Sequence, residues 1–271
     1  MSLETKIRER TEEIAWANKE LQQRVYEIEK LNEKLQQIND TKTKYLLQAT
    51  HQLKAPFAAI QSYVDVLLRG FVGQISEQAT GIIIKIQTRC QMLSVLIKDM
   101  LELANLNSYV EENIKMREVS LGKITRKVMD SFLAIAEKEK ITLKYSNTAK
   151  NDIICCNQEQ MIILVSNILD NAIIYSLENT LVNIDIANTE KGLVSISITD
   201  RGIGIPEHNI SKIFQEYFRS NNATKKHENG TGLGLSISKR IADIHNAEIE
   251  VKSALGKGTT IKVIFREKST K

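Results

Sequence analysis

The sequence of 271 residues predicts two unlike parts. The first is an α-helical hairpin that forms a dimeric four-helix bundle, with a coiled coil at its N-terminus; the second is an α+β two-layer sandwich. Three observations support this prediction. All twelve glycines lie at or after Gly70. The glycine-free part carries a seven-residue apolar repeat, and the remainder alternates short β-type segments with helical patterns.

The first element is a long helix, because residues 1–69 contain no glycine and are rich in Glu, Lys, Gln and Leu. Two series of positions recur every seven residues, and the second becomes apolar toward its end. The series are Ile7, Ile14, Leu21, Ile28 and Leu35, and Ala17, Arg24, Leu31, Ile38 and Tyr45. This repeat favours a parallel coiled coil over a helix packed on a globular core. We assign residues 1–41 to it.

Two helices are predicted to form an antiparallel hairpin over residues 42–109. The first continues through Pro56 until the segment RGFVGQIS interrupts it, and the second runs from about Ser76 to Leu106. Neither helix can bury its apolar stripe alone, so hairpins from two chains are expected to form a four-helix bundle. Proline in a helix interior costs about 3 kcal/mol. Pro56 therefore marks either a boundary between two helices or a kink, and we favour the kink.

The sandwich is predicted for residues 110–271. Helical patterns lie at about 121–138, 158–175 and 233–245, and the candidate strands are REVS, ITLKYS, DIICC, LVNIDIA, LVSISITD, AEIEVKSA and TTIKVIF. Strands that are segregated beside a few helices indicate a mixed α+β sandwich rather than a doubly wound sheet.

Composition excludes several classes of protein. The net charge of +4 is weak for this length, and no basic stripe is interleaved with aromatic residues, so we expect no nucleic-acid partner. No apolar run approaches the length of a membrane span, and no signal peptide is present. The cysteines, Cys90, Cys155 and Cys156, suggest reduced thiols without a metal. We expect a cytoplasmic chain, either complete or part of something longer.

The most informative segment is NGTGLGLSISKRIADIHN, residues 229–246. Gly230, Gly232 and Gly234 alternate and lead directly into an amphipathic helix. Closely spaced glycines let backbone N–H groups approach phosphates, and a helix N-terminus adds a partial positive charge. The segment is neither a P-loop nor a dinucleotide fingerprint. By itself it is weak evidence for a phosphate site.

Three other segments carry polar residues suited to a nucleotide. In ITDRGIGIP, Asp200 at a strand end can accept a hydrogen bond from an exocyclic amine such as that of adenine. In NILDNAIIYS, Asn167 and Asn171 share one helix face with Tyr175. Amide oxygens suit Mg²⁺. The segment SALGKGTTIKVIF offers Thr259 at the start of a strand.

Taken in order, these segments resemble the motifs of sensor histidine kinases of bacterial two-component systems, over roughly residues 42–268. HQLKAP resembles the H box, NILDNAIIYS the N box and DRGIGIP the first glycine box. IFQEYFRS resembles the F box and NGTGLGLSI the second glycine box. A chance match of five motifs in this order is very improbable.

The resemblance implies a coiled-coil signalling helix (1–41), a dimerisation and phosphotransfer hairpin (42–109) and a catalytic ATP-binding domain (110–271). It implies His51 as the phosphoacceptor, with Gln52 beside it, and ATP and Mg²⁺ as cofactors with Asn171 as the metal ligand. The expected ATP-binding residues are Asn167, Asn171, Tyr175, Asp200, Gly202, Gly204, Arg219, Gly230, Thr231, Gly232, Leu233, Gly234 and Thr259. The glycines at 230–234 would form a mobile lid over the phosphates.

Three residues depart from the family pattern. Gln52 replaces the usual Glu or Asp after the histidine, so the carboxylate that orients the imidazole is missing. Ala55 replaces a Thr or Asn, which predicts weak phosphatase activity toward a partner. Ile174 stands where the N box usually has Lys, so the cation either comes from elsewhere or is not needed. Candidate replacements are Arg219, Lys225 and Lys226.

The expected function is autophosphorylation of His51, followed by transfer to an aspartate in the receiver domain of a response regulator. The alternative is a nucleotide-binding scaffold with weak or no kinase activity. A plain ATPase of the same fold is disfavoured, because Asn167 cannot take a proton from water. The expected partners are a second copy of the chain, the regulator and an upstream sensor domain outside this chain. The chain would then be cytoplasmic or the cytoplasmic part of a membrane-bound sensor.

Overall fold

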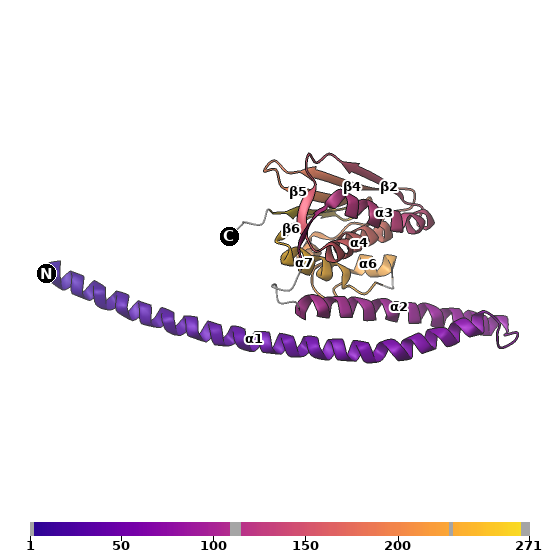
Figure 1. Ribbon diagram of the computed structural model, residues 1–271, viewed down its shortest axis with the longest axis horizontal. Helices are drawn as coiled ribbons and strands as arrows, with labels where there is room; N and C mark the ends of the chain where they lie inside the picture. The colour runs from indigo at the N-terminus through magenta and orange to yellow at the C-terminus, as the bar shows by residue number, and fades with distance from the viewer. Residues whose placement is uncertain (1–2, 109–114, 228–229, 267–271) are drawn as a thin grey trace.

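The computed structural model describes residues 3–108, 115–227 and 230–266. Two long helices form a hairpin, and a sandwich of sheet and helices packs along one side of it (Figure 1). A helical part followed by an α+β sheet domain is the fold class that the sequence predicts. The predicted boundary at 109/110 lies outside the described residues, and the boundary at 41/42 falls within an unbroken helix.

The hairpin consists of α1 (Leu3–Leu68) and α2 (Glu77–Ser108). Gln61 Nε2 donates to Ser94 Oγ at 3.0 Å, which links the two helices. Helix α1 continues through Pro56, so the alternative of a helix boundary at the proline is wrong. The N-terminal part of α1 extends beyond α2, and the whole helix is gently curved in Figure 1.

The sandwich is built on a five-stranded sheet with the order β2-β4-β5-β7-β6. Strands β2 and β4 are parallel, and the other pairs are antiparallel. A second sheet pairs β1 with β3 in antiparallel fashion. The strands are β1 (Arg117–Ser120), β2 (Thr142–Asn147), β3 (Ile153–Cys156), β4 (Leu181–Asn188), β5 (Val194–Thr199), β6 (Ala247–Ala254) and β7 (Gly258–Phe265).

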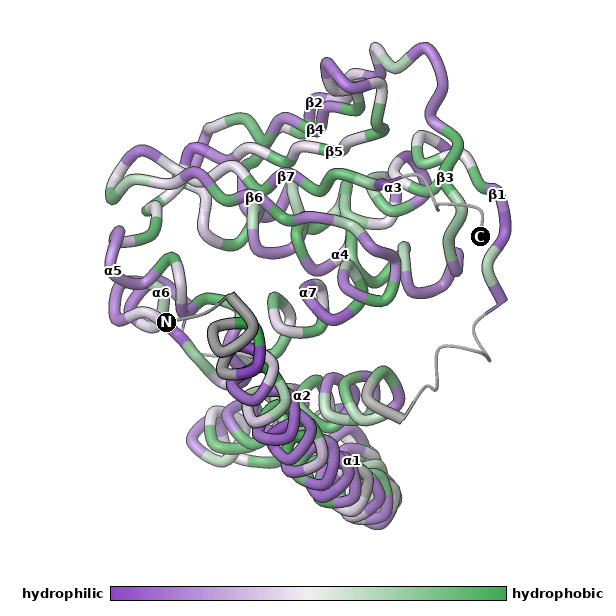
Figure 2. The backbone as a smooth tube through the Cα atoms, turned by 90° about the vertical axis from the view of Figure 1, so that its left-hand side faces the viewer, coloured by the Kyte–Doolittle hydropathy of each residue, from purple (hydrophilic) through white to green (hydrophobic). Residues whose placement is uncertain are grey.

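Three helices cover one face of the large sheet: α3 (Leu121–Lys138), α4 (Gln158–Tyr175) and α7 (Gly234–Ile244). Two short helices, α5 (Glu207–Ile210) and α6 (Asn221–Lys226), lie in the connection from β5 to α7. Alternate residues of β4 are buried toward the helices because strand side chains point to opposite faces. Figure 2 shows the resulting layers of sheet, helices and hairpin.

The C-terminal half of α2 belongs to the same hydrophobic core as the sandwich. Leu103 and Leu106 are almost fully buried there, and Leu96 and Met100 pack against the core. The hairpin and the sandwich are therefore joined by apolar packing as well as by the chain. Among the described residues, no helix combines the length and apolar character needed to cross a membrane.

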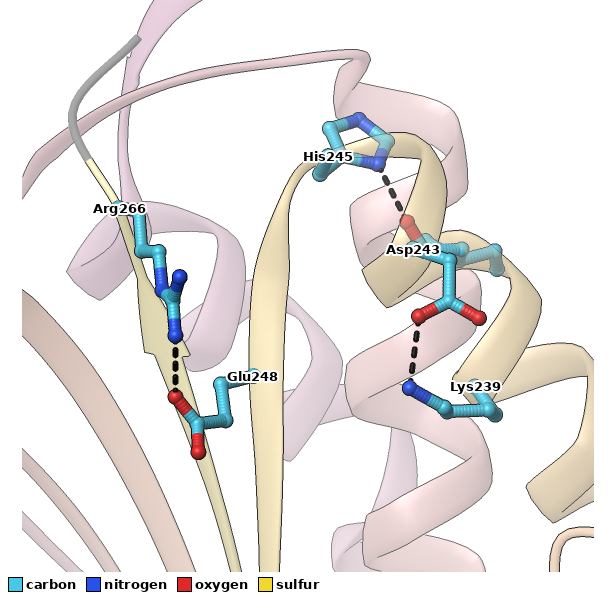
Figure 3. A network of polar contacts seen from close by, with 6 residues as sticks. Lys239, Asp243, His245, Glu248 and Arg266 are labelled. Carbon is cyan, nitrogen blue, oxygen red and sulfur yellow. Dashed lines mark hydrogen bonds and ion pairs between the residues drawn. The ribbon is translucent and has the colours of Figure 1, made fainter. Parts of the chain in front are cut away.

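A buried histidine connects the end of α7 with the start of α4. His245 Nε2 accepts the Asn157 N–H at 3.0 Å, so the ring proton lies on Nδ1. Nδ1 donates to the Ile241 carbonyl at 2.8 Å, which is the dashed line at His245 in Figure 3. The Asn157 side chain in turn caps α4 by accepting the Gln160 N–H. The exposed ion pairs nearby, Lys239–Asp243 and Arg266–Glu248, contribute less to stability. This contact fixes the helix that carries the N box.

Candidate functional site

A cavity of about 750 Å³ lies among α4, the ends of β5 and β7, the segment before α7 and one side of α2. All but two of the predicted ATP-binding residues line it. Those in the wall are Asn167, Asn171, Tyr175, Asp200, Gly204, Arg219, Gly230, Thr231, Gly232, Gly234 and Thr259. Motifs that are up to 92 residues apart in the sequence therefore meet in one hollow.

Asp200 follows β5 and is buried at one end of the cavity. Its Oδ1 accepts hydrogen bonds from the Gly202 N–H at 2.8 Å and the Thr259 N–H at 3.1 Å. Burial raises the pKa of Asp200 to about 6, although these backbone hydrogen bonds lower it. These two bonds fix the carboxylate at this end of the cavity, where it can accept a hydrogen bond from a ligand.

The N box forms the cavity wall from α4. Asn167, Asn171 and Tyr175 are spaced four residues apart, so they lie on one face of the helix. Asn167 Nδ2 donates to the Gly234 carbonyl at 3.1 Å, which joins α4 to the first residue of α7. The backbone N–H groups that begin α7 consequently lie beside the N box, where an anion would gain from them.

Two glycines are required by close approach of the backbone. Gly204 has φ +66°, and a Cβ there would overlap the Ala254 carbonyl. Gly232 has φ +73°, and a Cβ there would lie 2.8 Å from the Tyr217 carbonyl carbon. Both conformations are readily adopted only by glycine. The first pins the loop after β5 against β6, and the second packs the lid segment, residues 230–234, against the F box.

The two predicted ATP-binding residues outside the cavity wall are Gly202 and Leu233. A Cβ on Gly202 would overlap the Tyr175 carbonyl, so this glycine allows the loop to pack on the end of α4. Leu233 belongs to the lid segment, and its side chain is fully buried in the core. Both residues pack behind the cavity wall and stabilise it. Direct contact of either residue with ATP stays a prediction.

Of the three candidate cations, Arg219 alone lines the cavity. Its guanidinium lies 3.3 Å from the place of a Cβ on Gly230 and donates to the His227 carbonyl. Lys225 and Lys226 are exposed on α6 and are absent from the wall. His227 also lines the cavity, where burial, then the charge of Arg219, lowers its pKa.

Sequence reasoning missed the contribution of α2 to the cavity. Lys98 and Asp99 line it, together with Asp170 of α4. Thr231 Oγ1 donates to Asp99 Oδ2 at 2.7 Å, so the lid segment is bonded to the hairpin. Burial, and then the charge of Asp99, raise the pKa of Asp170 to about 6. The signal that the sequence offered was an acidic residue, Asp99, beside the apolar positions Leu96 and Met100 of the predicted helix.

The predicted phosphoacceptor lies on α1. The backbone of His51 is helical, and its side chain lies outside the described residues. Gln52 is exposed and does not line the cavity. Within residues 3–108, 115–227 and 230–266, no three His, Cys, Asp or Glu side chains gather as a metal site. The half-buried amide of Asn171 still fits Mg²⁺, because this ion keeps water and phosphate ligands and needs few from the protein.

Comparison with known proteins agrees with this geometry. Residues 156–269 match the family described as histidine kinase-, DNA gyrase B- and HSP90-like ATPases. The chain is 31% identical over 255 residues to sensor histidine kinase YkoH of Bacillus subtilis, covering 93% of this chain and 54% of that protein. It is 29% identical over 258 residues to histidine protein kinase SaeS of Staphylococcus epidermidis, covering 94% of this chain and 72% of that protein.

A solved structure supports the fold independently. Full-length ShkA in complex with AMPPNP superposes with a TM-score of 0.66 at 18% identity, covering 82% of this chain and 45% of that chain. The chain spans about half of YkoH and smaller shares of WalK of Bacillus subtilis and TmoS of Ectopseudomonas mendocina.

The fold and the cavity thus define an ATP-binding domain of the class shared by histidine kinases, DNA gyrase B and HSP90, joined to a helical hairpin. Relatives that are named as histidine kinases match 83% to 94% of this chain, so the similarity extends over the hairpin as well as the ATP-binding domain.

Proposed function

We propose that the chain is an ATP-dependent kinase that phosphorylates its own His51 and passes the phosphoryl group to an aspartate of a response regulator. The observation that carries this proposal is the single cavity where the N box, Asp200 and the lid segment meet. The relatives named as histidine kinases support it, and so does the ATP analogue AMPPNP in the complex of ShkA.

In this proposal one end of the cavity binds the adenine of ATP and the other end binds its phosphates. Asp200 accepts a hydrogen bond from the adenine amine, and Tyr175 lines the wall nearby. The lid glycines and the first N–H groups of α7 bind the phosphates. Mg²⁺, with Asn171 among its ligands, would supply charge neutralisation on the phosphates. Arg219 is the cation from the F-box side.

The transfer itself needs one nucleophile and one proton acceptor. An imidazole nitrogen of His51 attacks the γ-phosphorus, a P–N bond forms and the P–O bond to ADP breaks. The imidazole then gives up a proton to solvent or to a neighbouring base. Gln52 can accept a hydrogen bond from the ring but carries no charge, so we expect slow autophosphorylation.

Partners follow from the same proposal. The heptad positions of α1 are exposed in the single chain; Leu21, for instance, is 62% exposed. A second copy would cover this stripe as a parallel coiled coil. The receiver domain would meet the hairpin around His51, and Ala55 offers no side-chain hydrogen bond to orient water, so phosphatase activity toward it should be weak.

A scaffold that binds ATP without transferring phosphate is the second candidate, and the uncharged Gln52 favours it. The test is incubation of the chain with Mg²⁺ and γ-labelled ATP, beside His51→Ala and the matched control His208→Ala. Acid-labile, base-stable label that is absent only from His51→Ala supports the kinase. ATP binding without any label supports the scaffold and contradicts the kinase.

A further inference from the structure

The phosphate end of the cavity has a wall that comes from the hairpin. The lid segment and Asn167 mark this end, because Asn167 is bonded to the Gly234 carbonyl. Asp99 of α2 lies there as well, since it is bonded to Thr231 between two of the lid glycines. An acidic side chain from another part of the fold thus stands where the phosphates of a nucleotide are expected.

Packing holds Asp99 in this place. Leu96, Met100, Leu103 and Leu106 lie on the side of α2 that packs into the core of the sandwich. Asp99 lies next to this stripe and is consequently half-buried rather than solvated. The apolar contacts already join the hairpin to the sandwich. The hydrogen bond of Asp99 therefore acts mainly to hold the lid segment against α2.

The hydrogen bond from Thr231 to Asp99 is a charge-assisted one. Thr231 Oγ1 donates to Asp99 Oδ2 at 2.7 Å, and an ionised acceptor makes such a bond roughly twice as strong as a neutral one. The same hydroxyl also accepts the Leu233 N–H at 3.3 Å. Through Thr231, Asp99 is therefore linked to the backbone of Leu233, the residue that precedes α7.

Negative charge is already concentrated here. Burial raises the pKa of Asp99, and the charge of Asp99 contributes to the raised pKa of Asp170. Lys98 is the cation that lowers the pKa of Asp99. A triphosphate that approached Thr231 would bring further negative charge close to both carboxylates, which is unfavourable in a partly desolvated site.

We propose that Asp99 is a latch on the nucleotide site: it holds the lid segment through Thr231, and the phosphates of ATP must displace it. This inference rests on the proposed function, because it assumes that the lid segment contacts phosphates. Thr231 exchanges one anionic acceptor, the carboxylate, for another, the phosphate. Asp99 then lowers the affinity for ATP while the lid segment is bonded to α2. Binding of ATP breaks this bond and releases the lid segment from the hairpin.

The test compares wild-type chain with Asp99→Asn at pH 8, using ATP and adenosine as ligands in calorimetric titrations. Glu102→Gln is the matched control, since Glu102 lies one turn further along α2 and is absent from the cavity wall. We expect Asp99→Asn to lower the Kd for ATP about tenfold and to leave the Kd for adenosine unchanged. Glu102→Gln should change neither value.

Thr231→Val provides the second arm. In the Thr231→Val background the gain from Asp99→Asn should shrink to under about threefold, because the latch is already broken. Without nucleotide, amide exchange across residues 230–234 should quicken in Asp99→Asn and in Thr231→Val. This measurement reports the latch even if one variant binds ATP poorly.

Equal gains in Asp99→Asn and Glu102→Gln would overturn the latch, as would an unchanged Kd for ATP or the full gain in the Thr231→Val background. These outcomes are independent of the kinase reaction. Wild-type chain that binds ATP without forming phosphohistidine would contradict the proposed function and leave the latch measurements valid.

Discussion

Among single residues, Gln52 bears most directly on the proposed chemistry. It follows His51 on α1 and is exposed, so a larger or charged side chain fits there without repacking. A carboxylate at this position would orient the imidazole and stabilise the charge that develops on it, as the orienting Asp does in the serine-protease triad. The amide provides a hydrogen bond alone.

We predict that Gln52→Glu raises the rate of autophosphorylation by about 10²-fold, within the range of acid–base effects in enzymes. The rate is measured as initial incorporation of label from γ-labelled ATP. Gln48→Glu is the matched control, because it adds the same charge one turn earlier on α1. An unchanged rate in Gln52→Glu would contradict this role for the missing carboxylate.

Asp170 illustrates the stability cost of a buried charge. Its pKa is raised from 3.8 to about 6 by burial and by Asp99. The folded state therefore binds the proton more tightly than the unfolded state, and this stability is lost as pH rises from about 4 through 6.

Asp170→Asn should accordingly raise the free energy of unfolding at pH 8 by about 3 kcal/mol and leave it nearly unchanged at pH 4. Urea unfolding at the two pH values measures this difference. Asp185→Asn, on the exposed position of β4, is the control and should be neutral at both. A gain of equal size at pH 4 and pH 8 would show that the charge is not responsible.

Among the elements, helices and strands of the sandwich were predictable from local pattern. Ser120 caps α3 and Asn157 caps α4, and β4 alternates buried with less buried residues, as its sequence does. The role of α2 in the cavity was not predictable, because it depends on how the hairpin docks. Arg219 reaches the cavity because it lies beside Gly230 and the His227 carbonyl, whereas Lys225 and Lys226 are exposed on α6.

Helix α1 leads to a prediction about assembly. Replacing Leu21 and Ile28 together by Glu places like charges along the predicted seam, so the chain should shift from dimer toward monomer in sedimentation velocity runs. Glu at Gln22 and Gln23 adds the same charge off the seam and should leave the dimer intact. A monomeric wild-type chain, or a dimer that survives the seam variant, would contradict the coiled coil.

At the scale of the whole molecule, the hairpin and the sandwich share one core and one cavity. Four of the five motifs, all but the H box, contribute residues to the cavity wall, from α4, the loop after β5, the F box and the lid segment. The opposite wall on α2 carries no motif. What the sequence lacked was the long-range packing of Leu103 and Leu106, which brings Asp99 to Thr231.

The central claim is that this cavity and His51 serve one reaction. The most direct measurement is the amount of label on His51, located by peptide mapping, after incubation of wild-type, Asp200→Asn and Asp185→Asn chains with Mg²⁺ and γ-labelled ATP. We predict label on His51 in wild type and Asp185→Asn, and a loss of at least about tenfold in Asp200→Asn, because the adenine loses its charged acceptor. Label on another residue, or undiminished label in Asp200→Asn, would contradict the account.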